Sequence, residues 1–157
     1  MRGVIGLTAG AFDLMHAGHV HFLREARSRC SRLIVCLQTS FADRPNKGPM
    51  KQTVYERWSV LESCKHVDGI VPYETEADFL NLLKTTQHDV RFLGSEYAVN
   101  TEDVTGYDLY HLTREAGVVE RDFDSFSRRV DSGDKKFICF IPRDHDWSSS
   151  KIRRAIE

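Results

Sequence analysis

The chain has 157 residues, of which 41% are hydrophobic and 29% are charged, and this balance favours one compact domain over a disordered segment. The formal net charge of -1 excludes the global basic field that is typical of nucleic-acid-binding proteins. No apolar run is long enough to span a membrane and no signal-peptide pattern opens the chain, so we expect a cytoplasmic protein with neither nucleic acid nor membrane as a partner.

The first elements along the chain form a β-α-β unit. Val4, Ile5 and Leu7 predict a short buried strand, after which Gly10 lets the chain turn sharply. Helical spacing follows over residues 20–30, and the apolar run 33–37 is typical of a parallel strand covered on both faces. The four cysteines are widely separated, lie mostly in apolar patterns and predict buried thiols in a reducing compartment.

A polar stretch, residues 39–52, comes next and carries Lys47. Its prolines and glycine block regular structure, so we expect a mobile loop. The following residues, 54–66, predict a helix in which Trp58 packs in the core.

The second half continues the alternation of strands and helices. Apolar runs predict strands near 69–71, 90–93 and 137–141, with a helix over 77–83. Within 99–136, Leu109, Leu112 and Ala116 favour an extended helical segment, and a last helix follows residues 148–150. We therefore expect an α/β fold: one Rossmann-like domain, residues 1–157, whose five-stranded parallel sheet has the order 3-2-1-4-5 and helices on both faces.

Polar segments follow three of these strands: residues 10–19, 94–97 and 143–151. In such a sheet, ligands bind beyond the carboxyl ends of the strands, where the strand order reverses. The three distant segments are therefore expected to converge on one crevice.

His16 and His19 lie where the first helix is expected to start. Three residues apart, they project from one helix face beside free backbone N–H groups, which favours a phosphate site, and Gly18 lets a ligand approach closely. Zinc ligation is disfavoured because no third ligand lies nearby in the sequence, so we predict no protein metal site. Ordinary surface histidines are the remaining alternative.

Three ordered motifs resemble one enzyme family. Gly10-Ala11-Phe12-Asp13 with His16 and His19 resembles the G-x-F-D-x-x-H-x-G-H signature of small nucleotidyltransferases. Asn46-Lys47-Gly48-Pro49, Glu56-Arg57 and His66-Val67-Asp68 are similar to the middle of cytidylyltransferases, and Arg143 with Ser148-Ser149-Ser150-Lys151-Ile152-Arg153 resembles their C-terminal signature. In size and layout the chain is most similar to the glycerol-3-phosphate cytidylyltransferases, whereas relatives that share only the first motif use ATP.

The resemblance implies roles for particular residues. The residues that it places in catalysis are His16, His19, Lys47 and Arg143. Those that it places at the nucleotide are Ala9, Gly10, Ala11, Phe12, Asp13, Gly18, Gly94, Glu96, Arg143, Ser148, Ser149 and Ser150. Lys47, Arg57 and Asp68 are assigned to the acceptor. For the serines a plain helix cap is the alternative, and for Arg57 a surface ion pair.

We therefore expect a nucleotidyltransferase that transfers CMP from CTP to a small phosphorylated alcohol, most plausibly glycerol 3-phosphate, and releases pyrophosphate. Mg²⁺ is expected to travel with the triphosphate, because Mg²⁺ usually binds substrate phosphates and keeps several waters. The partners are then small-molecule substrates and a second copy of the chain in a homodimer. The alternatives are an ATP-dependent adenylyltransferase and a nucleotide-binding regulatory module without turnover.

Overall fold

The computed structural model describes residues 3–94, 107–111, 136–142 and 154–155. Within these ranges strands and helices alternate along the first part of the chain, as the sequence predicts. The elements are β1 (Ile5–Gly10), α1 (Ala17–Arg27), β2 (Arg32–Gln38), α2 (Val54–Glu62), β3 (Gly69–Tyr73), α3 (Glu76–Thr85), β4 (Val90–Gly94), β5 (Tyr107–His111) and β6 (Lys136–Ile141).

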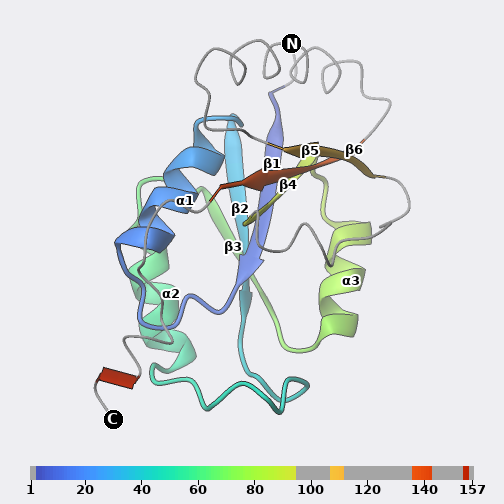
Figure 1. The fold of residues 1–157 in the computed structure, drawn as a ribbon. Coiled ribbons are helices and arrows are strands. Elements are labelled where there is room, and N and C mark those ends of the chain that lie inside the picture. Colours follow the sequence, from blue (N-terminus) through green and yellow to red (C-terminus); the bar gives the residue numbers. More distant parts are fainter. Residues whose placement is uncertain (1–2, 95–106, 112–135, 143–153, 156–157) are drawn as a thin grey trace.

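The described strands form one parallel sheet in the order β3-β2-β1-β4-β6-β5. Its first five strands confirm the predicted order 3-2-1-4-5, with β6 as the predicted fifth strand. The order reverses between β1 and β4, so the carboxyl ends of these two strands flank the expected ligand crevice. Helices α1 and α2 cover one face of the sheet and α3 covers the other (Figure 1).

The expectation of a helix through Leu109 is wrong. Residues 107–111 form the edge strand β5, in which Leu109 pairs with Ile138 of β6. Spacing alone favoured a helix here, but pairing with the exposed edge of β6 satisfies the backbone groups of both strands, and this tertiary effect overrides local pattern. The remainder of the expected helical segment, 99–106 and 112–135, lies outside the described residues. Arg154 and Ala155 are helical, and the other residues of the expected last helix also lie outside.

Each face of the sheet has its own buried cluster. On the side of α1 and α2, side chains such as Leu23, Leu33 and Leu61 pack together, and Trp58 packs against them as predicted. On the side of α3, Leu7 and Cys36 meet Phe79. Both faces are covered by packed side chains, which explains why the strands are almost continuously apolar in sequence.

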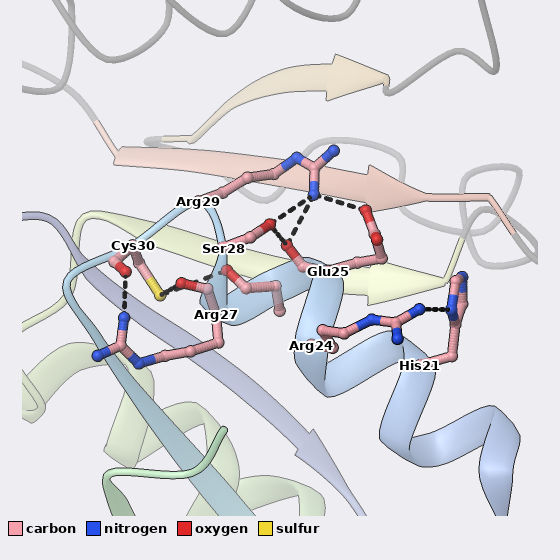
Figure 2. A network of polar contacts seen from close by, with 8 residues as sticks. His21, Arg24, Glu25, Arg27, Ser28, Arg29 and Cys30 are labelled. Atoms are coloured by element: carbon pink, nitrogen blue, oxygen red, sulfur yellow. Dashed lines mark hydrogen bonds and ion pairs between the residues drawn. The ribbon is translucent and has the colours of Figure 1, made fainter. Parts of the chain in front are cut away.

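The end of α1 is held by its own side chains (Figure 2). Arg29 Nη1 donates to the carbonyl and to the carboxylate of Glu25, at 2.7 and 2.8 Å, and Arg27 Nη1 donates to the carbonyl of Cys30 at 2.7 Å. The bonds to Glu25 lie in the last turn of the helix, the bond to Cys30 holds the chain that follows it, and both cations lie at the negative end of the helix dipole. The other end of α1 is thereby left to the histidine motif.

The cysteines are free thiols, and Cys30, Cys36 and Cys139 are buried as expected, whereas Cys64 is half-buried. Burial raises the pKa of Cys30 to about 11 and the pKa values of Cys36 and Cys139 to about 12. These three thiols are therefore protonated and unreactive at neutral pH. Among the described residues, no helix is long and apolar enough to cross a membrane.

Candidate active site

A tight turn links β1 to α1. Phe12 and Leu14 both have left-handed backbone conformations, with φ angles of 49° and 53°. Such angles are unfavourable for side chains of this size and persist only where surrounding contacts hold them. Gly10 leaves room for the Phe12 ring, because a Cβ atom at this position would lie 3.1 Å from that ring.

His16 and His19 together form the cap of α1. His16 is the N-cap residue, and its Nδ1 accepts a hydrogen bond from the backbone N–H of Gly18 at 3.0 Å. His19 reaches back, and its Nδ1 accepts from the backbone N–H of His16 at 3.1 Å. The two rings lie 4.0 Å apart between centroids, which confirms that the motif brings the imidazoles together.

These contacts determine which nitrogen of each ring carries the proton. Because Nδ1 is the acceptor in both rings, each neutral imidazole has its proton on Nε2 and presents an Nε2–H donor. The sequence pointed to the pair but not to this double use of imidazole in place of the usual Ser/Thr and Glu capping box. Two N–H donors beside the positive end of a helix dipole are suited to an anion.

Asp13 attaches this turn to the loop that carries Lys47. It is 2% exposed, and its two carboxylate oxygens accept from the backbone N–H groups of Gln52 and Lys51, each at 3.0 Å. The Asp13 side chain thus has a structural role, and the assignment of Asp13 to the nucleotide site stays a prediction. Phe12 is also buried, so its ring belongs to the core. Ala9 packs against the cluster on the side of α3, Gly10 ends β1, and the Ala11 carbonyl accepts from Arg57.

Arg57 of α2 is buried rather than placed at a surface. It is 1% exposed, and its guanidinium donates to the backbone carbonyls of Ala11 and Thr39, both at 2.9 Å, and to those of Gln38 and Gln52. Burial lowers the pKa of Arg57, and the nearby Asp13 carboxylate opposes that shift. These contacts give Arg57 a structural role and show that the surface ion-pair alternative is wrong, while its assignment to the acceptor stays a prediction. The burial of this charged side chain could not be read from the sequence pattern of the helix.

Asp68 lies at the wrong end of the sheet for an acceptor. It precedes β3, where its Oδ2 accepts from the backbone N–H of Leu33 at 2.8 Å and forms an ion pair with Arg27 Nε at 2.8 Å. The five residues of β3 separate it from the carboxyl edge by roughly 16 Å, at about 3.3 Å per residue. Asp68 thus joins the amino ends of β2 and β3 to α1, a placement that argues against its assignment to the acceptor.

Lys47 lies in the connection 39–53, which contains neither helix nor strand, as predicted. This lysine loop is attached to α3 through Glu76, whose backbone N–H donates to Asp43 at 2.7 Å and whose carboxylate pairs with Arg44 at 2.6 Å. In Figure 1 the loop lies beyond the carboxyl ends of β1 and β2, on the side of the histidine turn.

A cavity of about 450 Å³ opens under the lysine loop. The residues that line it are Thr39, Ser40, Phe41, Lys47, Gly48, Pro49, Met50, Gln52, Thr53, Val54 and Arg57. A second hollow of about 470 Å³ shares Thr39 and extends along the start of α3, where its polar lining includes Glu74, Asp78 and Asn81. One hollow thus has a lysine, and its neighbour has hydrogen-bonding groups without a cation.

The remaining predicted site residues fall into two groups. Gly18 is buried in the first turn of α1, and Gly94 ends β4, where it pairs with Ile141 at the end of β6. The ends of β1, β4 and β6 thus lie side by side, as the converging segments require. The others, Glu96, Arg143, Ser148, Ser149 and Ser150, lie outside the described residues.

The site combines paired imidazoles at a helix start, a lysine loop and a parallel sheet whose strand order reverses beside them. This combination is typical of α/β enzymes that bind the phosphates of nucleotides. The chain belongs to the cytidylyltransferase-like family, whose model matches residues 7–155. It is therefore an enzyme of the nucleotidyltransferase type.

The sequence of this chain matches one part of several longer proteins. The chain is 40% identical over 111 residues to bifunctional protein HldE of Caulobacter sp. (strain K31), and the match covers 69% of this chain and 22% of that protein. It is 37% identical over 107 residues to bifunctional protein HldE of Granulibacter bethesdensis, covering 67% and 21%. The matched segment is about a fifth of the length of these relatives.

Solved structures confirm the fold. A lipopolysaccharide core biosynthesis protein from Thermoplasma volcanium GSS1 superposes with a TM-score of 0.59 at 16% identity, over 92% of this chain and all of that one. Pantothenate synthetase from Thermus thermophilus has a TM-score of 0.50 at 11% identity, over 98% of this chain and 65% of that one.

Proposed function

We propose that this chain transfers the adenylyl group of ATP to a phosphorylated sugar and releases pyrophosphate. The observation that carries the reaction class is the pair of Nε2–H donors of His16 and His19 at the start of α1, with ring centroids 4.0 Å apart. Phosphoryl-type transfer needs positioned positive charge and donors rather than a nucleophilic side chain.

The reaction forms one bond and breaks another at the same phosphorus. An oxygen of the acceptor phosphate attacks the α-phosphorus of the nucleoside triphosphate, and the bond to the β-phosphate oxygen breaks as pyrophosphate leaves. The two imidazoles donate to phosphate oxygens that gain charge in this step, and Lys47 offsets the charge of the approaching acceptor. Neither role requires proton loss from an imidazole, which agrees with the Nε2–H tautomer that the cap imposes.

Mg²⁺ fits this proposal as a companion of the nucleotide. Among the described residues, no three His, Cys, Asp or Glu side chains gather at a metal site, and the Asp13 carboxylate is occupied by two backbone N–H groups. Mg²⁺ often binds mainly to substrate phosphates and neutralises their charge, so we propose that it enters with the nucleotide.

The similarity to HldE proteins favours the ATP-using alternative over CTP and glycerol 3-phosphate, our first expectation from the sequence. The relatives at 37% and 40% identity are HldE proteins, and one structural neighbour is named for the biosynthesis of the lipopolysaccharide core, which is built from sugars. A sugar phosphate also suits the two adjoining hollows, since its phosphate matches Lys47 and its hydroxyls match Glu74, Asp78 and Asn81.

Pyrophosphate release tests the proposal directly. The chain is incubated with Mg²⁺ and either ATP or CTP, together with a panel of aldose phosphates, glycerol 3-phosphate or phosphocholine. We expect ATP with an aldose phosphate to exceed CTP by about 10²-fold or more, because polar groups that pair with one base are left unpaired by the other. Faster release with CTP and glycerol 3-phosphate would return the cytidylyltransferase assignment. Nucleotide binding without release from any acceptor would favour a regulatory module.

A further inference from the structure

Gln52 connects the two halves of the site through both its backbone and its side chain. Its backbone N–H donates to Asp13 Oδ1 at 3.0 Å, and its side-chain Oε1 accepts from the backbone N–H of Leu14 at 2.8 Å. Leu14 is one of the two left-handed residues of the turn and lies two positions before His16. The strained turn is therefore fastened at adjacent residues by a single glutamine.

The other side of Gln52 belongs to the lysine loop. It lines the same cavity as Lys47, and its carbonyl accepts from Nε of the buried Arg57 at 3.3 Å. It also directly precedes Thr53, the N-cap of α2. Movement of Gln52 relative to α2 is therefore restricted, and its amide transmits this fixed position to the histidine turn.

We propose that Gln52 is a positioning residue that holds the His16–His19 pair in register with the lysine loop. The proposal rests on the proposed nucleotidyl transfer, in which small displacements of positioned groups reduce the rate more than they reduce substrate affinity. Gln52 acts through the Leu14 backbone, so its loss changes the orientation of the imidazoles rather than removing a contact with substrate. No motif in the sequence pointed to this residue.

Three substitutions separate positioning from general stability. Gln52→Met keeps the length and volume of the side chain and the backbone bond to Asp13, but removes the acceptor for Leu14. Gln52→Asn keeps an amide that is one methylene too short to reach. Gln87→Met is the matched control, because Gln87 is exposed and precedes β4 at the opposite edge of the sheet. Urea unfolding of all variants is used to check that each is folded under assay conditions.

Two readouts decide the proposal. We expect kcat of Gln52→Met and Gln52→Asn to fall by about 10-fold or more, with the Kd for nucleotide within about threefold of wild type, while Gln87→Met is unchanged. We also expect ¹⁵N NMR to show one Nε2–H tautomer for His16 and His19 in the wild type and a mixture in Gln52→Met.

An unchanged histidine spectrum in Gln52→Met overturns the proposal, and so does a kcat within twofold of wild type in both variants. A fall in kcat that merely follows the unfolded fraction overturns it as well. If the wild type has no turnover, the proposed function fails, and the tautomer measurement still decides the role of Gln52.

Discussion

The imidazole of His19 accepts a hydrogen bond from the backbone N–H of His16, while the His16 ring accepts from Gly18, so the two site residues are also the helix cap. In the proposed reaction, stability and chemistry therefore depend on different nitrogens of the same rings. Nδ1 accepts from the helix backbone, and we propose that Nε2–H donates to phosphate. A substitution that keeps the cap acceptor but removes the Nε2–H donor separates the contribution to stability from the contribution to turnover.

Replacement of His16 by Asn tests that separation. Asn is a favourable N-cap and accepts from the helix N–H groups, so His16→Asn is expected to keep the free energy of unfolding within a few tenths of a kcal/mol, whereas His16→Ala loses about 1 kcal/mol. Both variants lose the Nε2–H donor, so turnover is expected to fall by about 10²–10³-fold in each. Urea unfolding and pyrophosphate release measure the two effects. Wild-type turnover in His16→Asn would show that this histidine serves only as a cap.

Lys47→Ala is expected to affect turnover much more than stability. The side chain is exposed on a loop without helix or strand, and exposed substitutions usually change the free energy of unfolding by less than about 0.5 kcal/mol. Loss of one charge at the reacting phosphates should lower kcat by about 10²-fold. Lys84→Ala on α3 is the matched control, and an equal loss of activity in that variant would contradict a special role of Lys47.

The mobility predicted for the lysine loop is tested by proteolysis. ATP with Mg²⁺ is expected to protect the segment from Arg44 to Lys51 from trypsin, because closure over nucleotide would shield its basic side chains. Identical cleavage with and without nucleotide would count against a closing loop.

Arg57→Ala is expected to destabilise the fold by about 3 kcal/mol or more. The substitution leaves several buried carbonyls without their charged donor, and hydrogen bonds to charged groups contribute about 1.5–3 kcal/mol each. Arg57→Lys keeps the charge but not the fork of donors, so an intermediate loss is expected. Urea unfolding gives the values, with the exposed Arg32→Ala as control. A stable Arg57→Ala variant with a raised KM for acceptor would restore the substrate role.

His88 should make stability depend on pH. It is 2% exposed, its Nδ1–H donates to the carbonyl of Thr86 at 2.7 Å, and burial lowers its pKa. Since the unfolded state then binds more protons, stability falls as pH drops below the unfolded value of about 6.5 toward the lower folded pKa, with a slope of at most about 1.4 kcal/mol per pH unit.

His88→Asn keeps a donor near the Nδ1 position and removes the titration. Urea unfolding between pH 5 and pH 8 should give a smaller acid slope for this variant, and parallel curves above pH 7, where the histidine is neutral in both states. Equal acid slopes in the two proteins would assign the effect to other groups.

The sequence predicted the parts of this molecule that are written in local pattern. The apolar runs located the strands in the correct order, and the spacing of His16 and His19 brought their rings together at a helix start. It failed where the outcome depends on tertiary placement. Asp68 belongs to a motif that resembles the family, yet the direction of β3 puts it at the amino end of that strand. Leu109 pairs with a strand that begins 27 residues later along the chain. The hydrogen bonds of Gln52 involve backbone groups, which leave no residue signature.

The guanidinium of Arg57 holds both ends of the lysine loop, at Thr39 and at Gln52. A loop whose ends are fixed in this way can change length and sequence without moving its attachment points, and doubling its length costs only about 0.6 kcal/mol in closure entropy. Asp43, Arg44 and the Lys51 backbone add further attachments within residues 40–51, and the rest of the segment can vary between its fixed ends. In the proposed function, such fixed ends would let a new acceptor preference arise by changes within one loop, while the His16–His19 pair stays in place.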